Sequence, residues 1–452
     1  MKKLLAFMSL AVLAVVLPAS SLPAAAAAET QTYLINFEGE GLPSDARQTV
    51  ERAGGTVLKE DPGLSYIKAS SSDSDFLSEI RKDADVASAG VEQRIVQETA
   101  IERQPLESTG DHPLYEPYQW DIQQVTQNGE SWNLPAGKGS RDVVVAVIDT
   151  GVDLEHPDLR DSIVDVKSFV PGESPQDVRG HGSHVAGSIA ADGAVLGVGP
   201  QLGIAALKVF PKEGGAPTSW IVDAIRYAAD RDYDVMNMSL GSYVFLQDPD
   251  GSPDQYMADI NLFKKAIAYA HEKGVTVVGS AGNAAADISN PARLTHHFDD
   301  GGDDKGATHR NPASNLLIRV SAGNKDKELT FYSNYGVGKI DLMAPGGDLG
   351  PDYNPETGEG RDHTYLCLST VPVVENGNVT GHGYAWYGGT SMAAPKTAGA
   401  AGVVIAKHGK NRLSPSEVKS ILQQSAEDLY QKGYDAQSGF GLVNAVSALN
   451  RR

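Results

Sequence analysis

Four nearly continuous apolar runs constrain the fold of this chain more than any other feature of its sequence. The runs are 143–148, 205–210, 235–240 and 275–279. Strands that are apolar on both faces are typical of parallel sheets covered on both sides. Residues 219–231 and 262–273 lie between the runs and space their apolar residues as helices do. Residues 119–452 are therefore predicted to form a three-layer α/β fold around a central parallel sheet.

A smaller alternating unit precedes this region. The patterns predict strands at 32–37, 56–58, 66–69 and 86–97, and helices at 43–53 and 74–82. The order β-α-β-β-α-β is that of a small ferredoxin-like α+β module, which we place at residues 29–97. Residues 98–118 are polar and contain three prolines, so we expect an exposed linker there.

The first 28 residues have the pattern of a secretory signal peptide. Lys2 and Lys3 precede an apolar run at 4–17, and small residues follow at 24–28. The run is too short for a membrane helix, and no second long apolar segment follows it. We expect a secreted, extracellular protein that has no membrane attachment once the signal is removed.

The charge and the single cysteine exclude several classes of protein. The formal net charge of −20 at pH 7 argues against nucleic acid or an anionic membrane as a partner. Because Cys367 is the only cysteine, no disulfide can form within the chain. It lies in an apolar stretch that we predict to be a buried strand, where a lone cysteine is usually a small apolar residue.

Two polar motifs lie early in the predicted α/β region. Asp149 ends the first apolar run, at the carboxyl edge of the sheet where active sites of α/β folds lie, although a structural turn has the same pattern. His181 begins a predicted helix that continues with Gly182 and Gly187, so this helix can pack closely on its neighbours. His184 follows without the acidic residue of the His-Glu-x-x-His metal motif, and we expect no metal here.

A third motif surrounds Ser391. Two glycines precede Thr390 and Ser391, and a helix rich in alanine and glycine follows them. A serine at a helix N-terminus is most often only a cap. Its backbone N–H can also face a negative charge, with help from the helix dipole.

In sequence order these motifs resemble the subtilisin-like serine proteases, the subtilase family. The order Asp, His, Ser is the subtilisin order of the catalytic triad. Residues 280–283 match the family's oxyanion-hole motif, and the similarity covers nearly all of residues 119–447. The resemblance implies roles for Asp149, His181 and Ser391 as the triad, Asn283 in the oxyanion hole, and Ser239, Leu240 and Gly241 in substrate binding. The module at 29–97 resembles the family's inhibitory propeptide.

The sequence departs from the family pattern near these motifs. The departures are Ser183, Ala394, Lys396 and Thr397, and none of them removes a reacting group. Segment 192–195 is shorter than the family's calcium-binding loop, although Asp158 matches a ligand position. The resemblance therefore leaves a structural calcium ion open. The chemistry itself requires no cofactor.

The resemblance implies a secreted serine endopeptidase that hydrolyses peptide bonds through an acyl-enzyme and is made as a self-processed zymogen. Its partners are then a protein or peptide substrate and its own propeptide, and we expect a monomer. Residues 119–121 and 220–225 also resemble, more weakly, the subtilases that process lanthipeptide leaders. A selective processing protease is therefore an alternative to a general one.

Two rival functions predict different sequences. A non-catalytic binding protein on this fold would have lost a triad residue or Asn283, and none is lost. An esterase of the α/β-hydrolase type would have Gly-x-Ser-x-Gly with its histidine after the serine. Here Ser391 lies in Gly-Thr-Ser-Met-Ala, and the histidine comes first. Segments 243–261 and 284–312 look like insertions without an assigned role, and the second is more typical of a solvated acidic loop than of a metal site.

Overall fold

The computed structural model of the chain describes residues 29–97, 104–106, 114–245, 256–298, 309–310 and 315–451. The predicted signal peptide (1–28) and most of the predicted linker (98–118) lie outside the described residues. Within the described ranges, no helix has the length and apolar character that crossing a membrane requires.

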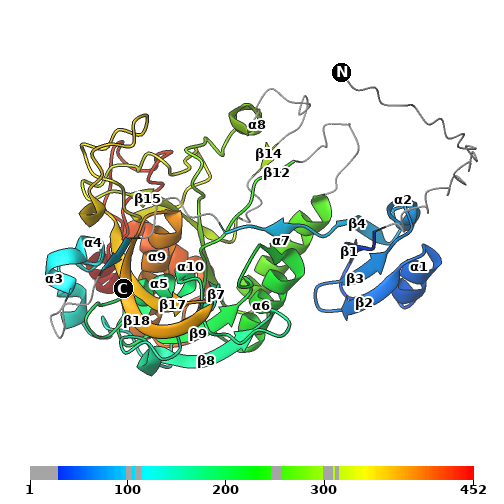
Figure 1. Ribbon diagram of the computed structural model, residues 1–452, viewed down its shortest axis with the longest axis horizontal. Coiled ribbons are helices and arrows are strands. Elements are labelled where there is room, and N and C mark those ends of the chain that lie inside the picture. Colours follow the sequence, from blue (N-terminus) through cyan, green and yellow to red (C-terminus); the bar gives the residue numbers. More distant parts are fainter. Residues whose placement is uncertain are drawn as a thin grey trace, which may run out of the picture.

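A seven-stranded sheet forms the middle of the molecule (Figure 1). Its strand order is β16-β15-β13-β11-β7-β9-β8, and all neighbouring strands are parallel. The strands are β7 (Val144–Asp149), β8 (Ile163–Ser168), β9 (Gly203–Lys208), β11 (Val235–Met238), β13 (Thr276–Ser280), β15 (Ile318–Gly323) and β16 (Leu342–Pro345). The four apolar runs lie at β7, β9, β11 and β13, so the predicted parallel sheet is confirmed.

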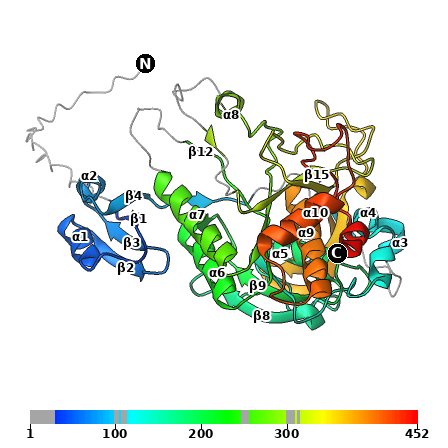
Figure 2. The same cartoon turned by 180° about the vertical axis from the view of Figure 1, so that it is seen from behind.

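Helices cover both faces of this sheet, as Figures 1 and 2 show from opposite sides. One layer contains α5 (His181–Ala190), α9 (Thr390–His408), α10 (Pro415–Ser425) and α11 (Ala445–Asn450), and the other contains α6 (Thr218–Asp230) and α7 (Met257–Glu272). Alternate residues of β7 pack against the two helical layers: Val145 and Val147 lie in one core, and Ala146 and Ile148 lie in the other. The three-layer α/β fold is therefore confirmed.

The N-terminal unit (29–97) lies against α6 and α7, at the right of Figure 1. Its elements are β1 (Gln31–Phe37), α1 (Ala46–Arg52), β2 (Thr56–Asp61), β3 (Tyr66–Ser71), α2 (Phe76–Ile80) and β4 (Val86–Val91), in the predicted order. They form an antiparallel sheet of order β2-β3-β1-β4. Tyr33 and Phe76 pack in the unit's own core. Leu34 and Tyr66 pack instead with the core of α6 and α7, which joins the two parts.

The predicted last strand of this unit is divided in the structure. After β4, the chain leaves the sheet, and β5 (Arg94–Ile95) pairs antiparallel with β10 (Ala216–Pro217), directly before α6. We call residues 93–97 the cleft segment. The pairing brings this segment to the carboxyl edge of the central sheet.

A second antiparallel sheet packs on α5. Its strands are β17 (Cys367–Glu375), β18 (Asn378–Tyr387) and β6 (Gln104–Leu106). Cys367 is fully buried in β17, as predicted. Two of its strands, β17 and β18, form the most extensive strand pairing of the described chain.

The region before residue 119 differs from the expected exposed linker. Residues Tyr115–Tyr118 form helix α3, followed by α4 (Trp120–Thr126). The start of this helix is fixed against the rest of the chain because Leu114 is buried and donates its N–H to the Ala194 carbonyl oxygen at 2.7 Å.

The remaining elements are short. They are the 3₁₀ helices η1 (Glu130–Asn133), η2 (Arg160–Ser162) and η3 (His363–Tyr365), helix α8 (Pro291–Phe298), and strand β12 (Val244–Phe245), which pairs with β14 (His309–Arg310). The two predicted insertions therefore pair with each other.

Candidate active site

Asp149 and His181 form a buried pair at the carboxyl edge of the sheet. Asp149 is the last residue of β7, and His181 is the first residue of α5. Nδ1 of His181 lies 2.9 Å and 3.0 Å from the two carboxylate oxygens of Asp149. The helix can approach this closely because a Cβ on Gly182 would lie 2.0 Å from the Gly151 carbonyl oxygen. Only glycine fits there, which agrees with the close packing predicted for this helix.

Ser391 has its hydrogen-bond partner outside this pair. It is the second residue of α9, and it is almost fully buried. Its Oγ donates a hydrogen bond of 3.3 Å to the carbonyl oxygen of Ser239. Among the described residues, Nε2 of His181 has no hydrogen-bond partner. The serine and the histidine are thus not hydrogen-bonded to each other in this state.

Asn283 is anchored to the start of α9. Its Oδ1 accepts hydrogen bonds from Thr390 N at 2.9 Å and from Thr390 Oγ1 at 2.8 Å. Since the carboxamide oxygen is used in this way, the two N–H groups of Nδ2 are the donors left for a bound molecule. The orientation of the amide therefore follows from its bonds to Thr390.

The predicted site residues meet in one pocket, which we call the nucleophile pocket. Its lining is Ser239, Leu240, Gly241, Ser242, Tyr243, Ser280, Gly282, Asn283, Thr390 and Ser391. All three predicted substrate-binding residues, the predicted oxyanion residue and the predicted nucleophile are in this set. Asp149 and His181 lie outside the pocket lining, with Asp149 at the end of β7, which neighbours the strand β11 that leads to Ser239.

The cleft segment reaches the buried pair. Nε2 of Gln97 donates a 2.9 Å hydrogen bond to Oδ1 of Asp149, and both side chains are buried. Thr150 N also donates to the same oxygen, at 2.7 Å. The carboxylate of Asp149 is therefore surrounded by donors from the N-terminal unit, from its own turn and from His181.

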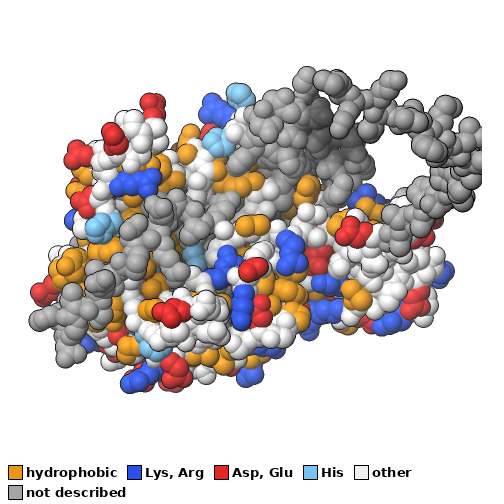
Figure 3. Space-filling view, in the orientation of Figure 1, with side chains coloured by type: hydrophobic (Ala, Val, Ile, Leu, Met, Phe, Trp, Pro, Cys, Tyr) orange, Lys and Arg blue, Asp and Glu red, His pale blue; other side chains and the backbone are white. Residues whose placement is uncertain are grey.

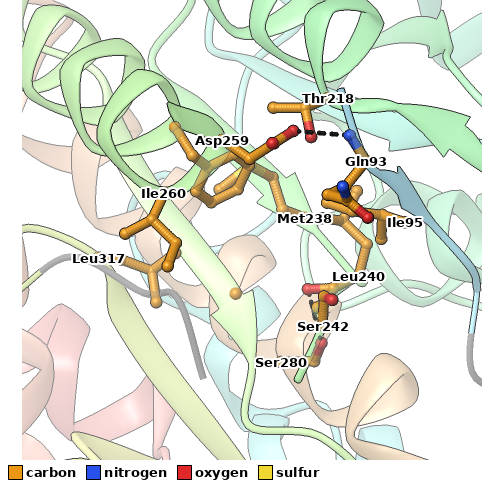
Figure 4. A pocket seen from close by; sticks show the side chains of 13 residues that line it. Gln93, Ile95, Thr218, Met238, Leu240, Ser242, Asp259, Ile260, Ser280 and Leu317 are labelled. Carbon is orange, nitrogen blue, oxygen red and sulfur yellow. Dashed lines mark hydrogen bonds between the residues drawn. The ribbon is translucent and has the colours of Figure 1, made fainter. Parts of the chain in front are cut away.

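A second, mostly apolar pocket lies upstream along the cleft segment, and we call it the upstream pocket (Figure 4). Its lining is Gln93, Ile95, Thr218, Met238, Leu240, Gly241, Ser242, Asp259, Ile260, Phe263, Gly279, Ser280 and Leu317. Leu240 and Gly241 line both pockets. The stretch predicted to bind substrate therefore lies between two adjacent pockets.

Asp259 is the residue of this region that the sequence analysis missed. It lies in the first turn of α7, and its Oδ1 accepts the backbone N–H of Gln93 at 3.1 Å, drawn as a dashed line in Figure 4. Burial raises the pKa of Asp259 to about 7. Its position inside a predicted insertion gave no signal, because its importance depends on contacts with residues far away in the chain.

His184 is part of the support for the site and not of its chemistry. Its ring stacks on Tyr387 with centroids 4.4 Å apart, and Nε2 lies 3.0 Å and 3.1 Å from the carbonyl oxygens of Cys367 and Ala385. Burial holds the pKa of His184 well below its usual range. The ring is therefore neutral and donates from Nε2 to the β17–β18 hairpin.

Lys396, one of the departures from the family pattern, forms a fully buried ion pair. Its Nζ lies 2.8 Å from Oδ2 of Asp121, and neither side chain is exposed. Nζ also donates to the carbonyl oxygen of Met392 at 3.0 Å. Burial alone would lower the pKa of Lys396, but the charge of Asp121 raises it. This pair connects α4 to the helix that carries Ser391.

The residues around Asp158 do not fit a calcium ion. Its Oδ2 accepts hydrogen bonds from Val195 N at 3.0 Å and from the hydroxyl of Tyr384 at 3.1 Å. A Cβ on Gly193 would lie 2.1 Å from Oδ1, so the chain packs directly on this carboxylate. A cation needs oxygen acceptors around it, whereas Asp158 here faces an N–H and an O–H. Among the described residues, no group of three or more histidine, cysteine or acidic side chains is arranged to hold a metal.

The fold and the site together define a serine protease: a buried Asp–His pair, a serine at a helix N-terminus and an asparagine amide converge at one sheet edge. A family model described as the Subtilase family, Peptidase_S8, matches residues 140–441. The chain therefore belongs to the subtilase family and is a subtilisin-like serine protease, a hydrolase.

Curated relatives agree with this assignment. The chain is 30% identical to subtilisin E of Bacillus subtilis (strain 168) over 446 residues, which cover 95% of this chain and 94% of the relative. It is 30% identical over 370 residues to the nisin leader peptide-processing serine protease NisP of Lactococcus lactis subsp. lactis, covering 76% of this chain and 50% of the relative. The resemblance predicted from the motifs is confirmed.

Solved structures show the same fold. The epidermin leader peptide processing serine protease EpiP from Staphylococcus aureus superposes with a TM-score of 0.74 at 24% identity, covering 94% of this chain and 99% of that one. The nisin leader peptidase NisP from Lactococcus lactis gives a TM-score of 0.63 at 27% identity, covering 75% of this chain and 95% of that one. Leader-processing proteases are thus among the structural neighbours.

Proposed function

We propose that this protein is a secreted serine endopeptidase that is made as a self-inhibited precursor and cleaves peptide bonds through Asp149, His181 and Ser391. The observation that carries the proposal has two parts at the ends of the neighbouring strands β7 and β11. They are the buried pair, with His181 Nδ1 2.9 Å from Asp149 Oδ1, and the pocket that contains both Ser391 and Asn283. The protein acts as a monomer, needs no cofactor and has no nucleic-acid partner. The net charge of −20 supports the last statement.

The chemistry follows from these positions. Ser391 Oγ rotates from the Ser239 carbonyl towards Nε2 of His181, loses its proton to that nitrogen and attacks the substrate carbonyl carbon. Asp149 holds Nδ1 of His181 protonated and stabilises the imidazolium that forms. His181 then gives the proton to the leaving amine, and an acyl-enzyme on Ser391 remains until water hydrolyses it. The Nδ2 donors of Asn283 and the backbone N–H of Ser391 stabilise the oxyanion.

The contacts of the cleft segment support the self-inhibited state. Arg94 and Val96 are exposed, whereas Ile95 and Gln97 are buried, as in a strand with one covered face. The backbone pairing of β5 with β10 is the way in which an extended peptide adds to a sheet edge. Because Gln97 ends beside Asp149, the segment occupies the place of a substrate.

The rest of the N-terminal unit binds α6 and α7 through polar contacts. Lys68 donates to Ser219 Oγ at 2.9 Å, and Arg226 pairs with Asp61. Asn36 donates to the carbonyl oxygen of Ala258 at 2.9 Å. Figure 3 shows basic and acidic side chains beside one another along the boundary between this unit, at the right, and the rest of the molecule. These contacts support the role of the unit as an intramolecular inhibitor, which cleavage within 98–118 releases.

The experiment compares the secreted wild-type chain with Ser391→Ala by intact mass and by hydrolysis of casein. The wild type should lose the N-terminal unit by a cut within 98–118 and then hydrolyse casein, while Ser391→Ala should do neither. Ser72→Ala, at an exposed serine of the N-terminal unit, is the matched control and should behave as the wild type. Identical behaviour of Ser391→Ala and the wild type would show that Ser391 is not the nucleophile.

A second candidate function is the selective processing of leader peptides. It is favoured by the 30% identity to the nisin leader peptide-processing protease and by the resemblance of residues 119–121 and 220–225 to such enzymes. A wild type that matures but leaves casein intact, while it cuts a lanthipeptide precursor at one bond, would select this function over general proteolysis.

A further inference from the structure

The cleft segment carries one basic side chain, and that side chain has a defined environment on the protease. Nε and Nη2 of Arg94 donate to the carbonyl oxygen of Gly215 at 3.1 Å and 2.7 Å. The guanidinium carbon also lies 5.8 Å from the centroid of the Trp220 ring. A Cβ on Gly215 would lie 2.5 Å from the Ile95 carbonyl oxygen, so this glycine permits the close approach of the segment.

The backbone on the N-terminal side of Arg94 is fixed from both sides. The N–H of Gln93 donates to Asp259 Oδ1 at 3.1 Å, and the carbonyl oxygen of Gln93 accepts from Thr218 N at 3.1 Å. Figure 4 shows Asp259, Thr218 and Gln93 side by side among the residues that line the upstream pocket. Asp259 is nearly fully buried, and its Oδ2 has no hydrogen-bond partner among the described residues. The contacts of Gln93 with Asp259 and Thr218 therefore set the direction of the next side chain, that of Arg94.

Side chains alternate along an extended segment, and this alternation separates two subsites. Gln93 and Ile95 both line the upstream pocket. Arg94, which stands between them in the sequence, lies against Trp220 and Gly215. We propose that Gly215 and Trp220 form a subsite for a basic substrate side chain, one residue before the residue that enters the upstream pocket. The proposal rests on the proposed function, because it takes substrates to lie where the cleft segment lies.

The chemistry of this subsite selects a cation. A carbonyl oxygen accepts hydrogen bonds but cannot donate them, and the face of an indole ring attracts positive charge. Arginine satisfies both, since its planar fork of donors can bond the carbonyl while it stacks on the ring. A glutamate in the same place would meet two electron-rich groups and find no donor. The preferred substrate is therefore an extended peptide with arginine followed by an aliphatic residue.

The first test measures peptide hydrolysis by the matured enzyme. Three peptides carry Arg, Ala or Glu directly before the Ile that enters the upstream pocket and are otherwise identical. The kcat/KM for the Arg peptide should exceed that for the Ala peptide roughly fivefold, as expected for an exposed cation over an aromatic ring, and Glu should be poorest. Trp220→Leu should lower the ratio of Arg to Ala, because only the Gly215 carbonyl oxygen then remains to bind the cation, and Trp220→Phe, which keeps an aromatic face, should retain most of it.

The second test does not depend on catalysis. Hydrogen–deuterium exchange is measured on the full-length Ser391→Ala chain, in which the cleft segment stays in place. The amides of residues 93–97 should exchange roughly fivefold faster in Arg94→Ala and in Trp220→Leu than in the parent or in Trp220→Phe. If the matured enzyme hydrolyses the three peptides without preferring Arg, and exchange is unchanged in the variants, the proposed subsite is wrong and the proposed function is unaffected. If exchange in the Ser391→Ala chain changes as expected but the matured wild type hydrolyses none of the peptides, the subsite is supported and the proposed function is refuted.

Discussion

Replacing one member of the buried Asp121–Lys396 ion pair should destabilise the protein strongly, while replacing both should restore much of the loss. Both side chains are fully buried, and Nζ of Lys396 has the Met392 carbonyl as its further partner. Removing one charge leaves the other in the core without a counter-charge, which costs about 3–5 kcal/mol in comparable buried pairs. We expect this loss in the free energy of unfolding for Asp121→Leu and for Lys396→Met.

The double variant Asp121→Leu with Lys396→Met removes both charges and keeps apolar volume. Because the desolvation cost of both ions disappears with their attraction, its free energy of unfolding should lie closer to that of the parent than either single variant does. The matched control is the exposed pair of Lys82 and Glu79, 2.6 Å apart. Exposed pairs contribute about 0–1 kcal/mol, so Lys82→Met should have little effect.

The assay is urea unfolding of full-length chains that carry Ser391→Ala, which prevents self-digestion. Tryptophan fluorescence reports on the region directly, since Trp120 lies next to Asp121 in α4. Single variants within about 1 kcal/mol of the parent would refute the reasoning, because such a value belongs to exposed pairs. A double variant whose loss equals the sum of the two single losses would also refute it, because the two charges would then be independent.

Three further predictions concern the site. Asn283→Ala should lower kcat about 10²–10³-fold, the loss measured for this donor in subtilisin, the type member of the family, and an unchanged kcat would contradict the oxyanion role. Burial raises the pKa of Asp259 to about 7 while the cleft segment lies over it, so the bound state favours the protonated carboxyl. Inhibition by the N-terminal unit should then weaken as the pH rises to about 7, measured as the inhibition constant against pH, and Asp259→Asn should remove this dependence. Treatment with EDTA should leave the thermal midpoint unchanged, because donors already satisfy Asp158, whereas Tyr384→Phe should lower it by removing one of them.

The sequence predicted the parts of the site that local pattern determines. Asp149 and His181 lie at a strand end and a helix start, and both boundaries follow from apolar periodicity and glycine placement. Asp259 and the partner of Lys396 could not be predicted, since each depends on a contact between segments far apart in the chain. The helix at Tyr115–Tyr118 was missed because Pro117 and the polar residues before it also suit a linker, and the burial of its neighbour Leu114 decides the outcome.

For the precursor proposed above, the geometry of the site indicates which step would activate it. Nδ1 of His181 already lies 2.9 Å from Asp149, so this half of the proposed triad needs no rearrangement. Ser391 needs only a side-chain rotation, and the 3.3 Å bond that holds it to the Ser239 carbonyl is a long one for a hydroxyl donor. By contrast, the buried Gln97 side chain is hydrogen-bonded to Asp149, and the cleft segment that carries Gln97 is paired with β10. The proposed function therefore predicts that activation depends on the departure of the cleft segment and not on a change in the fold around Ser391.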